Sequence, residues 1–243
     1  MKLLTDDLRA RLPALYSQES EAEPVDFPKI EAPDVSLIVS AGDDPARTAR
    51  SLRAVRENTG DLNFEVLAVG RELGPWKNVR LISNEYAAGF GEAHNKAVRQ
   101  ARGEVVVLLD DSVTVEAGWC EALLEPLRST PRAGAVGAEG GMLERDGSVT
   151  MLTARDSAEL READFCTTAC LAMTKNLFFQ VGGFDRDDLP VEEINLGLKI
   201  RRTGRKMLIQ PRCPITKPDR KIDPSRLESV RPKLRRWAEA IRI

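Results

Sequence analysis

Short apolar runs alternate with amphipathic stretches between residues 35 and 110 of the chain. Four aliphatic-rich runs predict β-strands, namely Val35–Ser40, Phe64–Val69, Val79–Ile82 and Val105–Leu109. Two longer stretches between them, Asp44–Glu57 and Gly91–Arg102, have the length and composition of helices. Short strands that alternate with helices of about ten or more residues are typical of βαβ units, whose parallel sheet is buried on both faces. This region therefore predicts an α/β fold.

The alternation becomes less regular after residue 111. We predict helices at Ala117–Arg128, Lys175–Val181 and Glu192–Gly204. The predicted strands are Gly134–Gly141, which includes a turn, Phe165–Met173 and Lys206–Ile209. The stretch Met151–Ala163 fits neither the helical period nor the strand period.

The N-terminal segment differs in composition from the rest of the chain. Residues 1–34 carry eight acidic and four basic side chains, a local net charge of −4. A stripe of leucines at positions 8, 12 and 15 predicts a short helix, and prolines at positions 24, 28 and 33 predict an extended connector. We therefore expect residues 1–34 to be an arm and linker ahead of one α/β domain at residues 35–221.

Residues 222–243 are expected to form an amphipathic basic helix. Apolar side chains recur there at spacings of three and four, at Leu227, Val230, Leu234, Trp237 and Ile241. Between Lys217 and Arg242 there are nine basic and four acidic residues, a local charge of +5. Two interpretations stay open: the helix packs on the domain with Trp237 docked, or it lies on an anionic membrane surface or a partner protein.

Composition argues against several classes of protein. The 243 residues carry a net charge of −2, so no global positive field is present that would suit a dedicated nucleic-acid binder. The longest aliphatic run, Val105–Leu109, is far shorter than the roughly 20 residues that span a bilayer, and the charged N-terminus has no apolar signal region. We expect a cytoplasmic protein, with peripheral contact at the inner face of the membrane left open by the basic tail.

The cysteine and histidine content narrows the candidate chemistry. Four scattered cysteines without a CxxC pair argue against a disulfide framework or a zinc site, so Cys166 and Cys170 are expected to be buried reduced thiols. The only histidine is His94, which disfavours a His-rich zinc centre and a Ser-His-Asp hydrolase with a spare histidine.

The end of the fourth predicted strand carries the clearest chemical signal, Asp110-Asp111-Ser112. In an open parallel sheet, ligands bind at the carboxyl ends of the strands. Two acids at that point can hold a ribose hydroxyl, or a divalent cation that neutralises a diphosphate. The simpler alternative is an acidic junction between a strand and a turn.

Further motifs accompany this one in a fixed order along the chain. They are Ala88–Phe90 after Asn84, Ala93–Asn95, Ala101–Asp111, Gly118–Trp119, Gly134–Ala138, Arg145–Ser148, Thr168–Met173, Val181–Asp185, Glu192–Leu196 and Arg202–Gly204. In this order and spacing, the sequence resembles the inverting GT-A glycosyltransferases of family 2, including rhamnosyl- and galactosyltransferase-like members. The resemblance runs from about Val35 to Lys217. It implies a GT-A fold, a Rossmann-like α/β architecture with a mixed, mostly parallel sheet between helices.

The resemblance also implies roles for particular residues. The nucleotide-sugar donor would contact Ser40, Gly70, Arg71, His94, Asn95, Asp110, Asp111 and Lys217. Glu193 falls at the catalytic acidic position, and Phe184, Asp185 and Glu192 fall on the side of the acceptor, a glycan or a lipid-linked hydroxyl compound. Asp111 and Ser112 fall within the Asp-x-Asp motif that binds a metal ion in the family.

The sequence departs from the family at several of these positions. Gly70 replaces an aspartate that contacts the base, Ser112 replaces the second acid of Asp-x-Asp, and Lys217 replaces a metal-binding histidine. A neutral hydroxyl is a weak ligand for a hard divalent ion, and a protonated lysine cannot bind one. The need for Mn²⁺ or Mg²⁺ is therefore left open. In the later helix, Asn195 and Lys199 replace an aspartate and an arginine.

Two accounts of function fit these departures. In the first, Lys217, with Arg71 or Lys206, stabilises the departing nucleoside diphosphate without a metal ion, and Glu193 is the general base. In the second, the chain is a catalytically inactive scaffold that binds a nucleotide or a partner protein. A nucleotidyltransferase is disfavoured, since no glycine-rich phosphate loop follows the first strand.

Plain structural roles are the alternatives for several residues. His94 would lie on the surface or cap its helix. Glu192 and Glu193 would be exposed acids at a helix start, where the helix dipole favours them. Gly182 and Gly183 would form a turn with positive φ. The functional interpretation depends on one condition, that Asp110 and Glu193 lie at one cleft.

Overall fold

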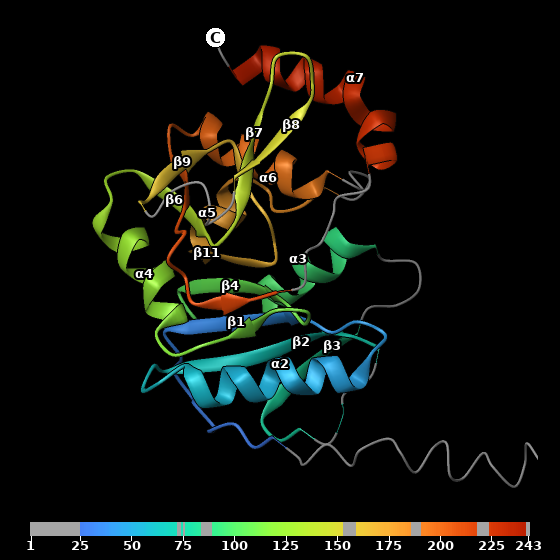
Figure 1. Ribbon diagram of the computed structural model, residues 1–243. Helices are drawn as coiled ribbons and strands as arrows, with labels where there is room; N and C mark the ends of the chain where they lie inside the picture. Colours follow the sequence, from blue (N-terminus) through green and yellow to red (C-terminus); the bar gives the residue numbers. More distant parts are fainter. Residues whose placement is uncertain are drawn as a thin grey trace, which may run out of the picture.

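The computed structural model describes residues 25–71, 74, 76–83, 89–152, 159–185, 191–217 and 224–241 (Figure 1). The short helix expected near Leu8 and the motif residues 84–88 lie outside these ranges. An α/β fold is confirmed, with one large sheet between two layers of helices.

The large sheet has eight strands in the order β3-β2-β1-β4-β11-β6-β12-β9. Their bounds are β1 Val35–Ser40, β2 Phe64–Gly70, β3 Val79–Ser83, β4 Val105–Asp110, β6 Ala133–Gly137, β9 Arg161–Ala163, β11 Cys170–Thr174 and β12 Lys206–Ile209. Strands β3, β2, β1 and β4 are parallel, β11 is antiparallel to both β4 and β6, and β12 is parallel to β6. The mixed, mostly parallel sheet expected from the resemblance is therefore present.

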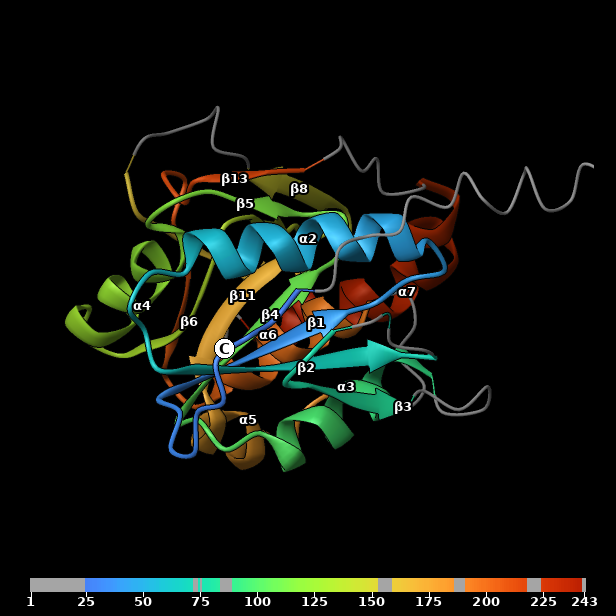
Figure 2. The same cartoon turned by 90° about the horizontal axis from the view of Figure 1, so that it is seen from below.

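Helices cover both faces of this sheet because its strands are apolar on both sides. The helices are α2 Pro45–Asn58, α3 Phe90–Gln100, α4 Trp119–Ser129, α5 Lys175–Gln180, α6 Glu192–Arg202 and α7 Pro224–Ile241. In β1, Leu37 and Val39 pack in one core cluster with α2 and α4, whereas Ile38 packs in the other with α3, α5 and α6. Figure 2 shows α2 on one side of the sheet and α3 and α5 on the other.

Two predicted strands are interrupted in the structure. The run Gly134–Gly141 divides into β6 and β7 (Gly140–Leu143), and Phe165–Met173 divides into β10 (Phe165–Cys166) and β11. The break between β10 and β11 occurs because residues 167–169 turn away to bind other parts of the chain. Strand β7 then joins β10 and β8 (Val149–Leu152) in a second sheet, and β5 (Thr114–Val115) pairs with β13 (Ile215–Thr216).

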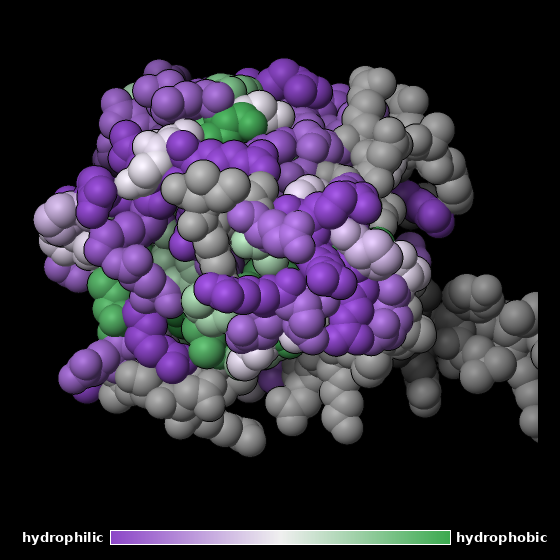
Figure 3. All heavy atoms as spheres, turned by 90° about the horizontal axis from the view of Figure 1, so that it is seen from above, coloured by the Kyte–Doolittle hydropathy of each residue, from purple (hydrophilic) through white to green (hydrophobic). Residues whose placement is uncertain are grey.

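The C-terminal helix α7 packs on α6 through one apolar stripe. Leu234 and Ala238 are buried in a cluster with Leu198 of α6, and Arg231 binds Asp146 at 2.9 Å. Docking on the domain, one of the two interpretations from the sequence, is therefore observed. No helix among the described residues is long and apolar enough to cross a membrane. Seen from the α7 side, the surface is mainly hydrophilic, with small separate apolar areas (Figure 3).

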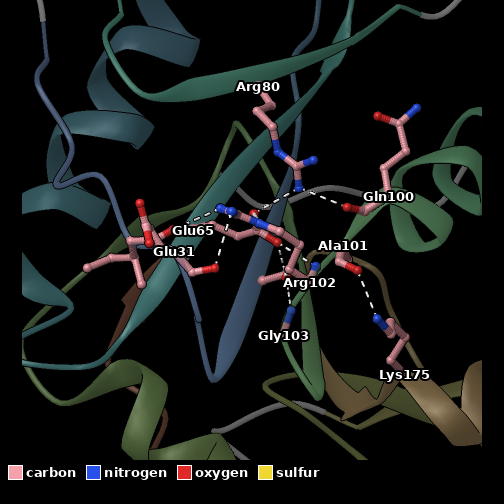
Figure 4. Close-up of polar contacts among 10 residues, drawn as sticks. Glu31, Glu65, Arg80, Gln100, Ala101, Arg102, Gly103 and Lys175 are labelled. Carbon is pink, nitrogen blue, oxygen red and sulfur yellow. Dashed lines mark hydrogen bonds and ion pairs between the residues drawn. The ribbon is translucent and has the colours of Figure 1, made fainter.

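A buried carboxylate fixes the edge of the sheet where β1 and β2 begin (Figure 4). Glu65 accepts hydrogen bonds from Ser36 Oγ (2.7 Å), the Arg102 backbone N–H (2.6 Å) and the guanidinium groups of Arg102 and Arg80 (2.8 Å each). Burial by itself raises the pKa of Glu65, but the donors from Arg102, Ser36 and Arg80 outweigh it and the pKa lies below its ordinary value. The charged form is therefore the one that the fold stabilises.

Replacing Glu65 by glutamine should destabilise the protein in a pH-dependent way. Glu65→Gln removes the charge that holds two guanidinium groups, at a cost of about 2–3 kcal/mol at pH 7. The folded pKa is lowered, so this stabilisation is present above the unfolded pKa of about 4.5 and is lost as the pH falls through the folded pKa. Urea unfolding at pH 7 and at about pH 3.5 measures the difference. The exposed Glu57→Gln is the control, and an equal effect of the two variants would contradict this role.

Shortening the buried side chain of Leu234 should release α7. The side chain is fully buried, so Leu234→Ala should cost about 2–5 kcal/mol through lost packing and a residual cavity. Hydrogen exchange of the α7 amides should accelerate, while the amides of the large sheet keep their protection. Arg236→Ala, at an exposed position of the same helix, should leave both quantities unchanged. Full protection of α7 in Leu234→Ala would contradict its docking through this stripe.

Candidate active site

The carboxyl ends of the central parallel strands meet at one edge of the sheet. Ser40 at the end of β1 pairs in register with Val69 of β2 on one side and with Asp110 of β4 on the other. Gly70 ends β2 beside them, and an added Cβ would lie 2.9 Å from the Cβ of Ala41. The backbone packing thus leaves no room for a larger side chain at position 70 unless the loop after β1 moves.

Asp111 fastens the loop between β1 and α2 to the end of β4. Its Oδ2 accepts from the Gly42 backbone N–H (2.7 Å) and Thr48 Oγ1 (2.6 Å), and its Oδ1 accepts from Arg47 Nε (2.8 Å). The side chain is only 2% exposed. The carboxylate expected to bind a nucleotide or a metal is therefore buried in protein contacts.

Arg47 and Thr48 were not anticipated from the sequence. They lie in the first turn of α2, whose N-cap is Asp44, and they face Asp111 across a separation of more than 60 residues. The position of these residues at a helix start directly after a strand was the only available signal. The hydrogen bond from Arg47 to Asp111 raises the pKa of the guanidinium further, so Arg47 stays charged.

Ser112 also serves an internal contact. Its backbone N–H and its Oγ donate to Asp110 Oδ1 at 2.9 and 2.5 Å. No group of three or more His, Cys, Asp or Glu side chains among the described residues is arranged to hold a metal ion. The donor set of Asp111 and Ser112 therefore does not fit the divalent cation that the family motif implies.

His94 is a buried residue, so the surface position, one of the alternatives from the sequence, is not observed. Its Nδ1 lies 2.8 Å from the Phe90 carbonyl oxygen, its Nε2 lies 2.7 Å from Ser40 Oγ, and its ring stacks on Phe90. Burial lowers the pKa of His94 to about 4, so the imidazole is neutral near pH 7. Because the carbonyl can only accept, Nδ1 carries the proton and Nε2 accepts from Ser40.

Asn95 binds the loop after α5 rather than pointing to open space. Its Nδ2 donates to the Phe184 carbonyl (2.8 Å), and its Oδ1 accepts from the Phe184 N–H (3.0 Å). The Phe184 ring is 3% exposed and packs edge-to-face against Phe90 and Phe178. A ring buried in this way does not reach an acceptor, which corrects the expected role of Phe184.

The two unusual residues of α6 also hold this loop. Asn195 donates to Asp185 Oδ2 (2.6 Å), and Lys199 forms an ion pair with Asp185 and donates to the Gly183 carbonyl (3.0 Å). Gly183 has a φ of +63°, which confirms the turn expected there. Asp185, predicted on the acceptor side, is thus engaged by α6.

Glu193 reaches the same edge of the sheet as Asp110. Its Oε1 accepts from the backbone N–H (2.8 Å) and Oγ1 (2.7 Å) of Thr168. The next residue, Ala169, accepts a hydrogen bond from the Asp110 backbone N–H (3.0 Å). Asp110 and Glu193 are therefore linked to the same turn at this edge, and a cleft lined by both side chains stays a prediction. Glu192 beside it is 7% exposed, so the expectation of two exposed acids is wrong.

The lysines expected to replace a cation have other partners. Lys217 pairs with Glu139, which also accepts from Thr167 Oγ1 (3.3 Å). Lys206 starts β12, so it lies at the opposite edge from Asp110, and it pairs with Glu162. Arg71 follows β2 at the correct edge, with its side chain 55% exposed. Of the basic residues proposed to replace the metal ion, Lys206 is thus excluded by its position at the opposite edge of the sheet.

Comparisons with known proteins identify similar sequences and folds. A family model described as "Glycosyl transferase family 2" matches residues 72–139. The chain is 27% identical to an uncharacterised protein, y4gI, of Sinorhizobium fredii, over 73% of this chain and 24% of that protein. It is 25% identical to the O-antigen biosynthesis protein RfbC of Myxococcus xanthus, over 76% of this chain and 17% of that protein. The chain therefore spans about a quarter or less of the curated relatives it matches.

Two solved structures share the fold. One is the crystal structure of GalNAc-T7 with UDP, GalNAc and Mn²⁺, with a TM-score of 0.64, 16% identity, and coverage of 88% of this chain and 53% of that one. The other is the mannosyltransferase PcManGT from Pyrobaculum calidifontis in complex with GDP-Man and Mn²⁺, with a TM-score of 0.60, 18% identity, and coverage of 96% and 82%. They show that the chain has the GT-A fold, and the match over residues 72–139 shows that this part of the chain is similar to the family 2 glycosyltransferases.

Proposed function

We propose that this chain transfers a glycosyl group from a nucleotide-sugar donor to a hydroxyl group of a glycan or lipid-linked acceptor, with inversion at the anomeric carbon. The observation that carries the proposal is the turn at residues 168–169, which binds Glu193 through Thr168 and Asp110 through Ala169. A candidate base and a candidate donor-binding acid are thereby held at one edge of the sheet. The two structural neighbours were solved with UDP and with GDP-Man, which supports a nucleotide-sugar donor.

In this proposal the donor lies across the ends of β1, β2 and β4. The loop after Ser40 and the backbone around Gly70 face the base, as the family resemblance implies for these two positions. Asp110 is half-buried at the end of β4 and faces the sugar or the ribose. His94 supports this edge as a neutral hydrogen-bond acceptor for Ser40, which keeps the Ser40 side chain in one orientation.

Glu193 acts as the general base in the transfer. The acceptor hydroxyl gives its proton to the Glu193 carboxylate while its oxygen forms a bond to the anomeric carbon. The bond from that carbon to the diphosphate breaks on the opposite face, and its electron pair leaves with the nucleoside diphosphate. A general base held in position in this way contributes typically about 10²–10⁴-fold in rate.

Two arginines lie at this edge, where the leaving diphosphate would form. Arg47 is fixed through Nε on Asp111, and no hydrogen bond engages its two Nη nitrogens among the residues that the structure describes. Arg71 is the second guanidinium group, and it is more exposed. A guanidinium fork matches phosphate oxygens in geometry and charge.

A catalytically inactive scaffold is the second candidate. The observation that favours it is that Asp111, Asn95 and Lys217, three positions expected to touch the donor, all bind protein groups. Such a protein would bind a nucleotide or a partner without turnover. The two candidates differ in transfer activity, not in fold.

Nucleotide-sugar donors should raise the melting temperature of the protein. A donor at about 100 times its Kd stabilises the folded state by about 2.7 kcal/mol, which is a shift of roughly 5–10 °C for a domain of this size. Thermal shift over UDP-, GDP- and dTDP-sugars, with Mn²⁺ and with EDTA, gives the measurement; the free sugar and inorganic phosphate are controls. If no donor changes Tm more than these controls do, the edge is not a donor site.

Glu193→Gln should abolish most of the transfer and spare donor binding. Glutamine keeps an oxygen for the two Thr168 donors but cannot take a proton, so transfer should fall by at least about 10²-fold. The donor-induced rise in Tm should persist, because Glu193 faces the acceptor. Glu239→Gln, at an exposed carboxylate on α7, is the matched control. Wild-type transfer by Glu193→Gln would refute the assignment, and donor binding without transfer by the wild type would favour the scaffold.

A further inference from the structure

Two consecutive threonines lie between two acidic side chains at the entrance of β11. Thr168 gives both its backbone N–H and its hydroxyl to a single oxygen of Glu193, at 2.8 and 2.7 Å. Thr167 donates its hydroxyl to Glu139 Oε2 (3.3 Å). Both threonines are less than 10% exposed. The turn thus holds two acids of different elements at fixed places.

The contact with Thr168 sets the conformation of a flexible side chain. Glutamate has three rotatable side-chain bonds, and Glu193 lies in the first turn of α6, where Val191 provides no side-chain cap. A carboxylate at a helix start is free to stay near its own backbone N–H groups. Here it crosses to another element instead, and a hydrogen bond to a charged group is about twice as strong as a neutral one.

The turn itself is held on both sides of Thr168. On one side the Thr167 N–H donates to the Glu139 carbonyl (2.9 Å), and the Glu139 side chain pairs with Lys217. On the other side the Ala169 carbonyl accepts from the Asp110 N–H (3.0 Å). The two donors of Thr168 therefore have a fixed position relative to the end of β4.

We propose that Thr168 is the positioning residue of Glu193: its two donors fix Oε1, and with it the plane of the carboxylate, for proton abstraction from the acceptor hydroxyl. This inference rests on the proposed function for its catalytic meaning. A general base must stay within hydrogen-bond reach of the proton that it removes, and a displacement of about 1 Å can cost about 100-fold in rate.

Three other acidic residues are connected to Glu193 through the sequence or through the 167–169 turn. Glu192 precedes it on α6, and Asp110 lies behind Ala169. Glu139 accepts a hydrogen bond from the Thr167 hydroxyl, and Lys217 forms an ion pair with Glu139. Burial raises the pKa of the Cys166 thiol to about 12, and the charge of Glu193 adds a smaller effect in the same direction.

In these surroundings the Thr168 donors have a measurable effect. Neighbouring carboxylates favour protonation of Glu193, whereas hydrogen bonds to the charged form oppose it. Removing the Thr168 hydroxyl should therefore raise the pKa of Glu193. As the pH falls, Glu193 should then become protonated, and stop acting as a base, at a higher pH than in wild type.

The test compares Thr168→Val, which keeps the shape but lacks the hydroxyl, with Thr168→Ser, which retains it. Thr168→Val should lower kcat for transfer by about 10- to 100-fold, with the donor KM within about twofold, and move the acidic limb of the kcat–pH profile to higher pH. Thr168→Ser should have a kcat and a kcat–pH profile close to those of the wild type. Thr150→Val is the matched control, since it removes a hydroxyl-to-carboxylate bond to Glu144 on exposed β8. Unchanged kcat and pH profile in Thr168→Val would overturn the inference.

A second readout does not depend on activity. Selective ¹³C labelling of glutamate carboxyls, with Glu193→Gln to assign the signal, gives the pKa of Glu193 in each variant by NMR. A higher pKa in Thr168→Val than in wild type and Thr168→Ser supports the inference, and equal values overturn it. If Thr168→Val does not fold, Thr168→Ala is titrated in its place. If the wild type is inactive but the Glu193 titration shifts in Thr168→Val, the proposed function is refuted and the role of Thr168 stands. If the wild type is active but the Glu193 titrations are equal, the role of Thr168 is refuted and the proposed function stands.

Discussion

The antiparallel entry of β11 beside β4 is the constraint on which the candidate site depends. Because β11 runs against β4, it begins at the edge where β4 ends, and the hydrogen bond from the Asp110 N–H to Ala169 joins the two. A parallel strand in this place would begin at the opposite edge, about one strand length or roughly 17 Å away. Thr168 and Glu193 would then lie far from Ser40 and Asp110. The strand direction thus joins the early half of the chain to the late half.

Two departures from the family pattern, and one arginine that the sequence did not indicate, have partners across the fold. Asn195 and Lys199 together bind Asp185, and Arg47 binds Asp111. These contacts hold loops in place: the loop after α5 in the first case and the loop after β1 in the second. A buried ion pair adds little net stability, but losing one partner is costly. Each of these residues is therefore explained by its partner in the structure and not only by the family residue that it replaces.

Most of the fold could be predicted because its signal is local. Aliphatic runs gave β1 and β12 with their bounds, and β4 to within one residue, since strands buried on both faces have near-continuous apolar sequences. The run Phe165–Met173 misled for the same reason, because its hydrophobicity does not show that the backbone turns at residues 167–169. Periodicity reports burial, not the direction of the chain.

The site was harder to predict because its contacts are distant in sequence. Family motifs indicated Asp110 and Glu193, but nothing local showed that Thr168, 25 residues before Glu193, would bind it. Arg47 was missed for the same reason, because it is separated from Asp111 by 64 positions in the sequence. His94 was expected near the surface because its helix has polar neighbours, whereas Ser40 and the Phe90 ring bury it. Partners across the fold decided each case.

The pairing of Arg47 with Asp111 also decides what charge a donor would meet. The edge carries the acids Asp43, Asp110 and Asp111 and the bases Arg47 and Arg71. Asp43 is 92% exposed, so water and salt screen it strongly, whereas a buried carboxylate would keep its repulsion for a diphosphate at close range. Asp111 is that buried carboxylate, and the guanidinium group 2.8 Å away neutralises it. In the proposed function, Asp111 therefore serves donor binding by fixing a cation and cancelling its own charge, which is a different task from holding a metal ion.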